Sequence, residues 1–289
     1  METVNFLNLK LKDESPLESA FNLASEVAVL GKNKKFAFGF IGFQFPQYAA
    51  LNQPPVLSKG FIVTSLTGSS YSDIIFRAVY RLSQITDSNS ISKSAKKLYS
   101  CPIFPFLLNT KLSSMCIQHS NTDTELLISH ENVDTTISIE NVDRTSIEIV
   151  LSSQEILLNN DFLEIYPKNF SSIFQVFKIY SQKNYQNLNY MFRSDRSRSL
   201  LTFTVFNESR EISMLRIPAT FANSEDFINE DFSVSIKLHQ LKALQSVYKA
   251  QTGNHFVIKL KLYDNTKLHF IALEQNGNTV QELILMTSM

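Results

Sequence analysis

The feature that most constrains this chain is a strand–helix pattern that occurs twice in its second half, 71 residues apart. When the sequence is shifted by 71 residues, each core position aligns one apolar residue with another, and one lysine aligns with another lysine. The aligned pairs are Leu163 with Val234, Ile165 with Ile236, Phe170 with Leu241, Ile173 with Leu244, Val176 with Val247, Phe177 with Tyr248 and Lys178 with Lys249. A repeated amphipathic unit predicts a repeat architecture, because each unit needs a neighbour to bury its apolar face. Chance alignment of two ordinary strand–helix pairs stays open as the alternative.

Apolar periodicity extends the same plan to the whole chain. Helices are expected over residues 15–31, from near Asp73, from Pro167 and over residues 239–250. Ser15 and Glu18 form a capping box for the first of these helices, and Gly31 ends it. Strands are expected over residues 4–11, 35–45, 112–119, 124–130, 135–140, 145–151, 163–166, 200–207, 211–218, 232–237, 255–263, 267–273 and 279–287. Each half therefore reads as strand, helix, strands, helix, strands.

Catalytic and metal-binding motifs are scarce. The 289 residues include seven glycines, which form no GxGxxG, no GxxxxGK[ST] and no GxSxG. The five histidines show no HxH or HExxH spacing, and Cys101 and Cys116 form no CxxC pair. We expect no enzyme, no cofactor and no metal site, and we expect both cysteines to be buried thiols. Catalytic groups that lie far apart in the sequence stay open as an alternative.

Nothing in the sequence predicts secretion or a membrane span. The first residues lack a basic and apolar leader, and the longest apolar stretch, residues 36–45, is about half as long as a span. With 44% hydrophobic residues the chain can bury one large core or two smaller ones. We expect an intracellular protein.

Charge is balanced in sum, with 27 basic and 27 acidic residues, but it is unevenly distributed. Residues 166–183 contain three lysines and no acid, and residues 237–251 also contain three lysines and no acid, whereas residues 120–150 contain seven acids. Arg77 and Arg81 lie four apart on the helix expected near Asp73. A helix face with lysine but no carboxylate suits phosphate contacts. For a single helix an ordinary solvated face is the alternative, but three such helices together favour a polyanion.

Two stretches carry a resemblance to a known family. Residues 146–174 read SIEIVLSSQEILLNNDFLEIYPKNFSSIF, and the tail from Phe232 begins FSVSIKLHQLKALQSVY and ends NTVQELILMTSM. Together with the plan of two similar halves, these stretches resemble the sliding clamps. That family includes the proliferating cell nuclear antigen (PCNA), the subunits of the nine-one-one checkpoint clamp and viral processivity factors. The resemblance covers the second half closely and the first half in plan only.

The resemblance implies an α+β fold of the DNA-clamp type, with two similar domains that each have antiparallel sheets outside and two helices on the inner face. It places clamp domain 1 at residues 1–152, an interdomain connector at 153–161 and clamp domain 2 at 162–289. It implies a ring-shaped homotrimer, or a heterotrimer with related subunits, that encircles double-stranded DNA without reading its sequence. The implied partners are a DNA polymerase, other clamp-binding proteins and a clamp loader, with no cofactor, metal or membrane.

The resemblance also assigns roles to residues. The cations implied to face DNA are Arg77, Arg81, Lys168, Lys178, Lys183, Lys242 and Lys249. Ile156, Leu157 and Leu158 of the connector are implied to bind partner peptides, with plain interdomain core as the alternative. The implied function is a replicative processivity clamp in a nucleus or at a viral replication site. A subunit of a checkpoint clamp in DNA-damage signalling is the second reading, and a non-DNA β-rich interaction module is the third.

Overall fold

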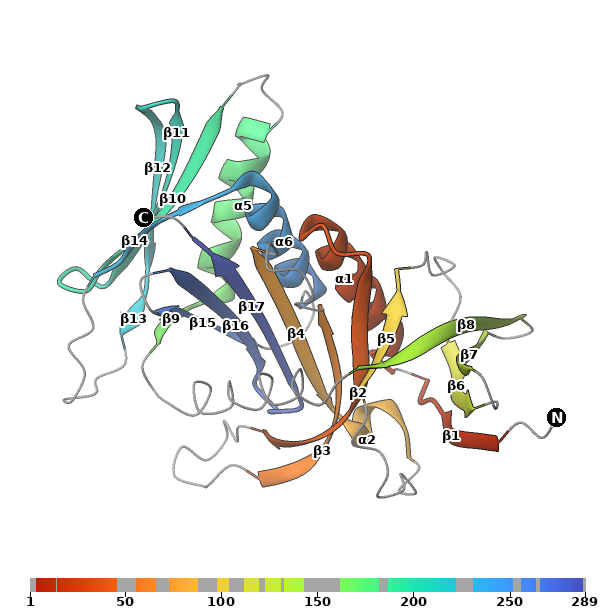
Figure 1. Ribbon diagram of the computed structural model, residues 1–289. Helices are drawn as coiled ribbons and strands as arrows, with labels where there is room; N and C mark the ends of the chain where they lie inside the picture. Colours follow the sequence, from red (N-terminus) through yellow and green to blue (C-terminus); the bar gives the residue numbers. More distant parts are fainter. Residues whose placement is uncertain are drawn as a thin grey trace.

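The computed structural model describes residues 4–13, 15–45, 56–65, 73–87, 98–103, 112–119, 123–130, 133–142, 162–181, 187–221, 231–251, 256–263 and 266–287. Within these residues the strands form a 13-stranded and a four-stranded sheet, and every strand pair is antiparallel. The three long helices α1, α5 and α6 stand in a row against the sheets (Figure 1).

The first half supplies most of the large sheet. In chain order its elements are β1 (Val4–Lys10), α1 (Leu17–Leu30), β2 (Lys35–Phe45), β3 (Val56–Ser65), β4 (Ile74–Arg81), α2 (Leu82–Ile85), β5 (Leu98–Pro102), β6 (Leu112–His119), β7 (Thr124–His130) and β8 (Val133–Val142). Helix α1 packs on β2, β3 and β4.

The second half completes the large sheet and forms the small one. Its elements are β9 (Leu163–Ile165), α5 (Pro167–Ser181), β10 (Leu188–Asp195), β11 (Leu200–Asn207), β12 (Arg210–Pro218), β13 (Thr220–Phe221), β14 (Ser233–Ile236), α6 (Leu238–Ala250), β15 (Phe256–Tyr263), β16 (Lys267–Glu274) and β17 (Thr279–Met286). The small sheet has the strand order β12-β11-β10-β14.

The two halves join along one strand pair. β17, the last strand of the chain, pairs with β4, so that Thr279 lies opposite Tyr80 and Leu285 lies opposite Ile74. We call this pairing the seam. Helices α1 and α6 contact each other on one side of it. The hydrophobic core on that side is continuous through both halves.

A smaller hydrophobic cluster covers the opposite side of the sheet, which we call the outer face. It crosses the seam, because Val79 of β4 and Val280 of β17 both belong to it. Phe43 and Phe45 of β2 belong to it as well. β2 and β4 are therefore covered on both faces and read as nearly continuous apolar runs.

The repeat in the second half is confirmed. β9 followed by α5 corresponds to β14 followed by α6, and the matched residues Phe170 and Leu241 are both fully buried. Lys178 and Lys249 both lie exposed near the ends of their helices. The two units therefore share the buried position at the start of the helix and the exposed lysine near its end, whereas Val176 is half-buried and its match Val247 is buried.

The prediction of a helix that begins near Asp73 is wrong. Residues 74–81 form strand β4, which is followed directly by α2, a helical turn four residues long. The spacing of Ile75, Val79 and Leu82 suggests a helix, but a strand covered on both faces also has apolar residues at those positions. The sequence-based prediction also missed β3, β5 and β10. Residues 145–151, expected as a strand, lie outside the described residues.

Smaller expectations have mixed outcomes. Cys101 and Cys116 are buried free thiols, as expected, and burial raises the pKa of Cys101 to about 12. No side-chain capping bond is made at the start of α1, although Ser15 Oγ accepts a long 3.4 Å hydrogen bond from the Leu17 N–H. Among the described helices, none is long and apolar enough to cross a membrane.

Candidate nucleic-acid interface

Helix α5 presents a solvent face that carries lysine but no carboxylate. Its buried side consists of Phe170, Ile173, Phe174 and Phe177. Lys168, Gln175 and Lys178 are exposed, and no residue of Pro167–Ser181 is acidic. The amphipathic spacing itself turns these polar residues away from the core.

Helix α6 repeats this arrangement. Leu241, Leu244 and Val247 are fully buried, while Lys242 and Lys249 are exposed. The two lysines lie seven residues apart and therefore share one line along the helix. No residue of Leu238–Ala250 is acidic.

The two lysine faces lie side by side. Tyr248 of α6 donates a hydrogen bond to the Pro167 carbonyl at 3.1 Å, and its ring lies 5.0 Å from that of Phe174 and 6.0 Å from that of Phe170. These contacts hold α6 against α5, and the two helices lie next to each other in Figure 1. Lys168, Lys178, Lys242 and Lys249 therefore belong to one helical layer, which we call the lysine wall.

Helix α1 continues this layer without cations. The residues of Leu17–Leu30 include Glu18 and Glu26 but no lysine or arginine. Ser246 of α6 donates a 2.6 Å hydrogen bond to Glu26 Oε1. Ser246 Oγ also lies 3.1 Å from the Lys242 carbonyl, which places the Glu26 carboxylate one helical turn from Lys242. The part of the layer contributed by the first half is thus acidic rather than basic.

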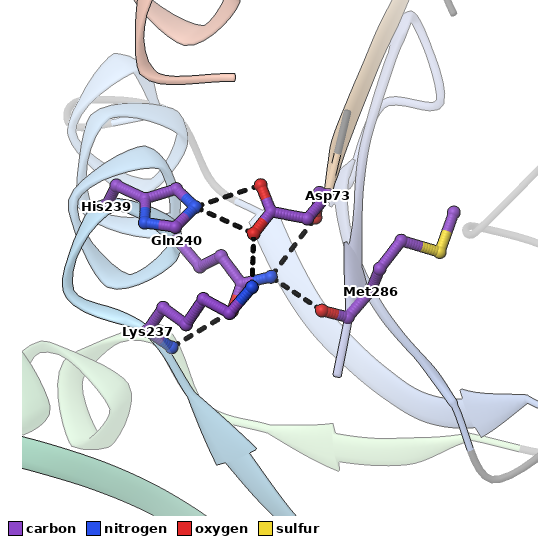
Figure 2. Close-up of polar contacts among 5 residues, drawn as sticks. All are labelled: Asp73, Lys237, His239, Gln240 and Met286. Atoms are coloured by element: carbon purple, nitrogen blue, oxygen red, sulfur yellow. Dashed lines mark hydrogen bonds and ion pairs between the residues drawn. The ribbon is translucent and has the colours of Figure 1, made fainter. Parts of the chain in front are cut away.

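A cluster of polar contacts fixes the start of α6 to the first half (Figure 2). Asp73, just before β4, accepts hydrogen bonds from His239 Nε2 at 2.9 Å and from Lys237 Nζ at 3.0 Å. Gln240 is fully buried, and its amide donates to the carbonyls of Asp73 at 3.1 Å and Met286 at 2.7 Å. We call this cluster the Asp73 clasp. It orients the helix that carries Lys242 and Lys249.

The clasp also sets the charge of its carboxylate. Burial alone would raise the pKa of Asp73, but hydrogen bonds and charge from His239 and Lys237 outweigh it and lower that pKa. Asp73 therefore stays ionised at neutral pH. Lys237 is engaged by this carboxylate and is a structural cation.

Arg77 and Arg81 do not join the lysine wall, which corrects the sequence-based expectation for both. Arg77, Val79 and Arg81 follow one another at every second position of β4, so they share one face of the strand. Because Val79 belongs to the outer cluster, both arginines point to the outer face. Arg77 is only 7% exposed, and its Nη1 lies 3.4 Å from Glu282 Oε2. Arg81 lies 4.7 Å over the ring of Phe45 and donates hydrogen bonds to the Gly277 carbonyl and Ser58 Oγ, both at 3.2 Å.

Arg77 belongs to a buried group of charges at the seam. Glu282 of β17 also interacts with His269 of β16, whose Nδ1 lies 3.0 Å from Glu282 Oε1. Burial would raise the pKa of Glu282, but the hydrogen bond from His269 and the charges of Arg77 and His269 lower it. These charges stabilise the joint between the halves and are shielded from any partner in solvent.

The remaining predicted site residues lie outside the described residues. They are Lys183, which follows α5, and the connector residues Ile156, Leu157 and Leu158. Phe162, which comes just after the predicted connector, packs into the outer hydrophobic cluster. The peptide-binding role of the connector stays a prediction.

Sequence reasoning missed Glu26 and Asp73. The run Leu17–Leu30 contains no cation, which could have shown that the first helix differs from the others in charge. Nothing in the sequence brings Asp73 to His239, because their contact spans 166 residues. Within the described part of the chain, no group of three His, Cys, Asp or Glu side chains could hold a metal ion.

Comparison with known proteins places this geometry in a class. One similar solved structure is a PCNA2–PCNA3 complex from Sulfolobus tokodaii, with a TM-score of 0.59 and 8% identity over 97% of this chain and 99% of that one. Another is PF-8, the DNA polymerase accessory subunit from Kaposi's sarcoma-associated herpesvirus, with a TM-score of 0.56, 11% identity and the same coverage. A. fulgidus PCNA, with the C-terminal region of FEN-1 bound, has a TM-score of 0.54 and 9% identity over 98% of each chain.

The fold is therefore that of the sliding clamps, as the sequence resemblance implied, and the likeness runs through both halves. No family model matches the sequence, and no curated protein matches it. These solved structures are described as PCNA or as a DNA polymerase accessory subunit.

Proposed function

We propose that this chain is a DNA sliding clamp that serves as a processivity factor for a DNA polymerase. The observation that carries the proposal is the lysine wall, in which two adjacent helices expose lysines and no carboxylate within a clamp fold. A protein that stays on DNA by encircling it needs only weak, sequence-independent phosphate contacts, which lysines supply.

The DNA-facing set is Lys168, Lys178, Lys242 and Lys249, with Lys183 added from its position in the sequence. Arg77 and Arg81 are left out because they lie on the outer face. The connector residues Ile156, Leu157 and Leu158 are proposed to bind peptides of the polymerase and of other clamp-binding proteins. A loader would place the ring on DNA, in a nucleus or at a viral replication site.

The strand edges support assembly into a ring. Within the chain, β17 follows the β15–β16 hairpin and pairs with β4, the third strand of the β2–β3–β4 meander. β8 follows the β6–β7 hairpin in the same way, and β12 is the third strand of the β10–β11–β12 meander. β8 therefore corresponds to β17, and β12 corresponds to β4. By analogy with the seam, β8 of one copy would pair with β12 of the next copy.

Exposure and charge fit this pairing. β12 ends the small sheet, and only residues 140–142 of β8 pair with β5. β12 carries exposed Arg210 and Arg216, whereas the part of β8 that does not pair with β5 exposes Asp134. Six domains from three copies would close the ring.

The first experiment is the native mass by light scattering on a sizing column. A mass of three chains supports a homotrimeric ring. A strict monomer would direct the search to related subunits of a heterotrimer, as in a checkpoint clamp, or to a monomeric processivity factor.

The second experiment tests the lysine wall directly. Replacing Lys168, Lys178, Lys242 and Lys249 by alanine should leave folding intact, because these side chains are exposed. The slope of log affinity against log salt concentration should become less steep by about 3 to 4. Each lost phosphate contact removes about 0.9 from this slope. Polymerase stimulation on long templates should fall with it.

A matched control changes four exposed cations away from the wall, Lys10, Lys34, Lys59 and Arg198, to alanine. This control has the same net charge as the wall variant and should keep most of the DNA affinity. Equal loss in both variants would mean that only overall charge matters, and the wall would then have no special role.

A further inference from the structure

A cavity of about 420 Å³ lies where β4 ends and the short helix α2 begins. β3 pairs with β2 along residues 56–65 but with β4 only from Gly60 onward, so residues 56–59 have no β4 residue opposite them. The cavity lies beside this part of β3. Ser58 and Lys59 of β3 line it, together with Arg81 of β4, residues of α2 and the segment that follows up to Asp87. None of the lysines of the lysine wall is in its lining.

The lining contains two cations that form no ion pair with any described residue. Arg77, on the same face of β4, lies beside a carboxylate, whereas Arg81 has a carbonyl, a hydroxyl and an aromatic ring beside it. Lys59 is exposed. Partial burial lowers the pKa of Arg81, because it removes water from the charged guanidinium. An anion beside this group would therefore be bound favourably.

The guanidinium of Arg81 lies at the wall of the cavity. Its Nη1 donates a 3.2 Å hydrogen bond to Ser58 Oγ, and both residues line the cavity and are half-buried. Its Nε donates to the Gly277 carbonyl, so Nη2 is left without a hydrogen-bond partner in the part of the chain that the structure describes. Ser58 Oγ accepts from Arg81 and keeps its own proton to donate. The wall thus offers a charged donor and a hydroxyl donor as neighbours.

The other polar side chains at the cavity leave it positive. Lys59 and Ser83 are exposed and add an ammonium from β3 and a hydroxyl from α2. Asp87 is the acid of the lining, and its Oδ1 is held by Lys12 Nζ at 2.7 Å. The donors come from three elements and therefore from different directions. A tetrahedral oxyanion can use such a set, and guanidinium and ammonium groups are its usual partners.

We propose that this cavity binds the phosphate group of a small phosphomonoester. Arg81 and the Ser58 hydroxyl donate to phosphate oxygens, and Lys59 supplies a second positive charge. The cavity is larger than a phosphate ion, so it has room for the organic part of the ligand. Its lining does not overlap the lysine wall, and the proposal does not rest on the proposed clamp function.

The test measures binding to the full chain without DNA, at one low ionic strength. The probes are inorganic phosphate, glycerol 2-phosphate, acetate and glycerol, and binding is followed by amide chemical-shift changes in NMR spectra. We expect both phosphates to bind. Acetate offers fewer oxygens and less charge, and glycerol carries no charge, so both should bind at least severalfold more weakly.

Variants of opposite effect locate the site. Lys59→Gln should weaken phosphate binding about two- to fivefold, the effect of one exposed charge, and Arg81→Gln should weaken it about tenfold or more. Asp87→Asn should tighten binding about two- to fivefold, because it removes the acid of the lining. Lys34→Gln is the matched control, since Lys34 is exposed and does not line the cavity. Lys59 and Asp87 are also exposed, so these variants should fold even if Arg81→Gln does not.

Any of three results would overturn the proposal. The first is acetate binding as tight as phosphate binding, or no phosphate binding to the wild-type chain. The second is phosphate binding that Lys59→Gln weakens no more than Lys34→Gln does. The third is an affinity for phosphate that Asp87→Asn lowers or leaves unchanged.

Discussion

β4 and β12 occupy the same position in two similar meanders, yet their surroundings differ. β4 is paired with β17 along its length, and its residues from Ile74 to Tyr80 are buried or half-buried. β12 ends its sheet, and most of its residues are exposed or half-buried, with Ile217 buried near its end. One edge is paired inside the chain, whereas the other has no strand beside it among the described residues. Unpaired edges of this kind readily accept another strand.

The helical layer differs between the halves as well. α1 brings two glutamates and no cation, while α5 and α6 bring lysines and no acid. A similar backbone plan thus serves two purposes, a closed joint in the first half and an exposed basic surface in the second.

The pairing of β4 with β17 can be weakened by changing its buried charges. Arg77→Met removes the cation facing Glu282 while the carboxylate stays buried. Breaking a buried pair from one side costs about 3–5 kcal/mol, which urea unfolding would measure. The double variant Arg77→Met, Glu282→Gln should recover most of this loss, because no charge of the pair stays buried and the carboxamide oxygen can still accept from His269 Nδ1. A single variant as stable as wild type would contradict the role given to the pair.

The proposed pairing of β12 with β8 of a second copy can be tested by reversing charges on the two strands. Replacing Arg210 and Arg216 by glutamate should weaken assembly by about ten- to a hundredfold, because like charges would face Asp134 of the next copy. Light scattering at falling concentration measures this change. Adding Asp134→Arg to the same chain should restore much of the assembly. If the threefold variant stays dissociated, β8 is not the partner of β12.

The acidic part of the helical layer can be converted to the basic kind. Glu26→Lys places a cation beside Lys242 and should steepen the salt dependence of DNA binding by about 0.9 in log–log slope. Filter binding over a range of salt measures this slope. Glu125→Lys on β7 makes the same change in net charge away from the helices and should alter the slope less.

The smallest expected effect concerns pH and the Asp73 clasp. The pKa of Asp73 is lower in the folded chain than in the unfolded one, so its contribution is present above the ordinary carboxyl pKa. That contribution, about 1 kcal/mol, should be lost as pH falls below about 4. Asp73→Asn should flatten this part of the stability profile. An unchanged profile would show that the clasp adds no stability.

The second half was largely predictable from the sequence. Its helices alternate buried aromatic or aliphatic residues with polar ones, as in Phe170 and Ile173, and this pattern marks both their positions and their exposed lysines. β10 was missed although Tyr190 and Phe192 are buried at alternate positions, because the apolar Met191 between them blurs the alternation.

The first half was predicted less well, for a physical reason. β4 is covered on both faces, so its sequence lacks the alternation that identifies a half-buried strand. Arg77 suggested a solvent face, but its partner Glu282 lies at the other end of the sequence. The charges of the lysine wall could be predicted from local pattern, whereas the clasp and the buried pair depend on contacts between distant residues.

The seam also dictates when the molecule can finish folding during synthesis. β4 and β17 are separated by roughly 200 residues, so β4 leaves the ribosome about 10 to 40 s before its partner strand exists. Throughout that interval a long apolar edge is uncovered, which is the condition that favours misassembly. A chain that stops before β17 would lack the strand that closes this edge, and we expect it to depend on chaperones to stay in solution.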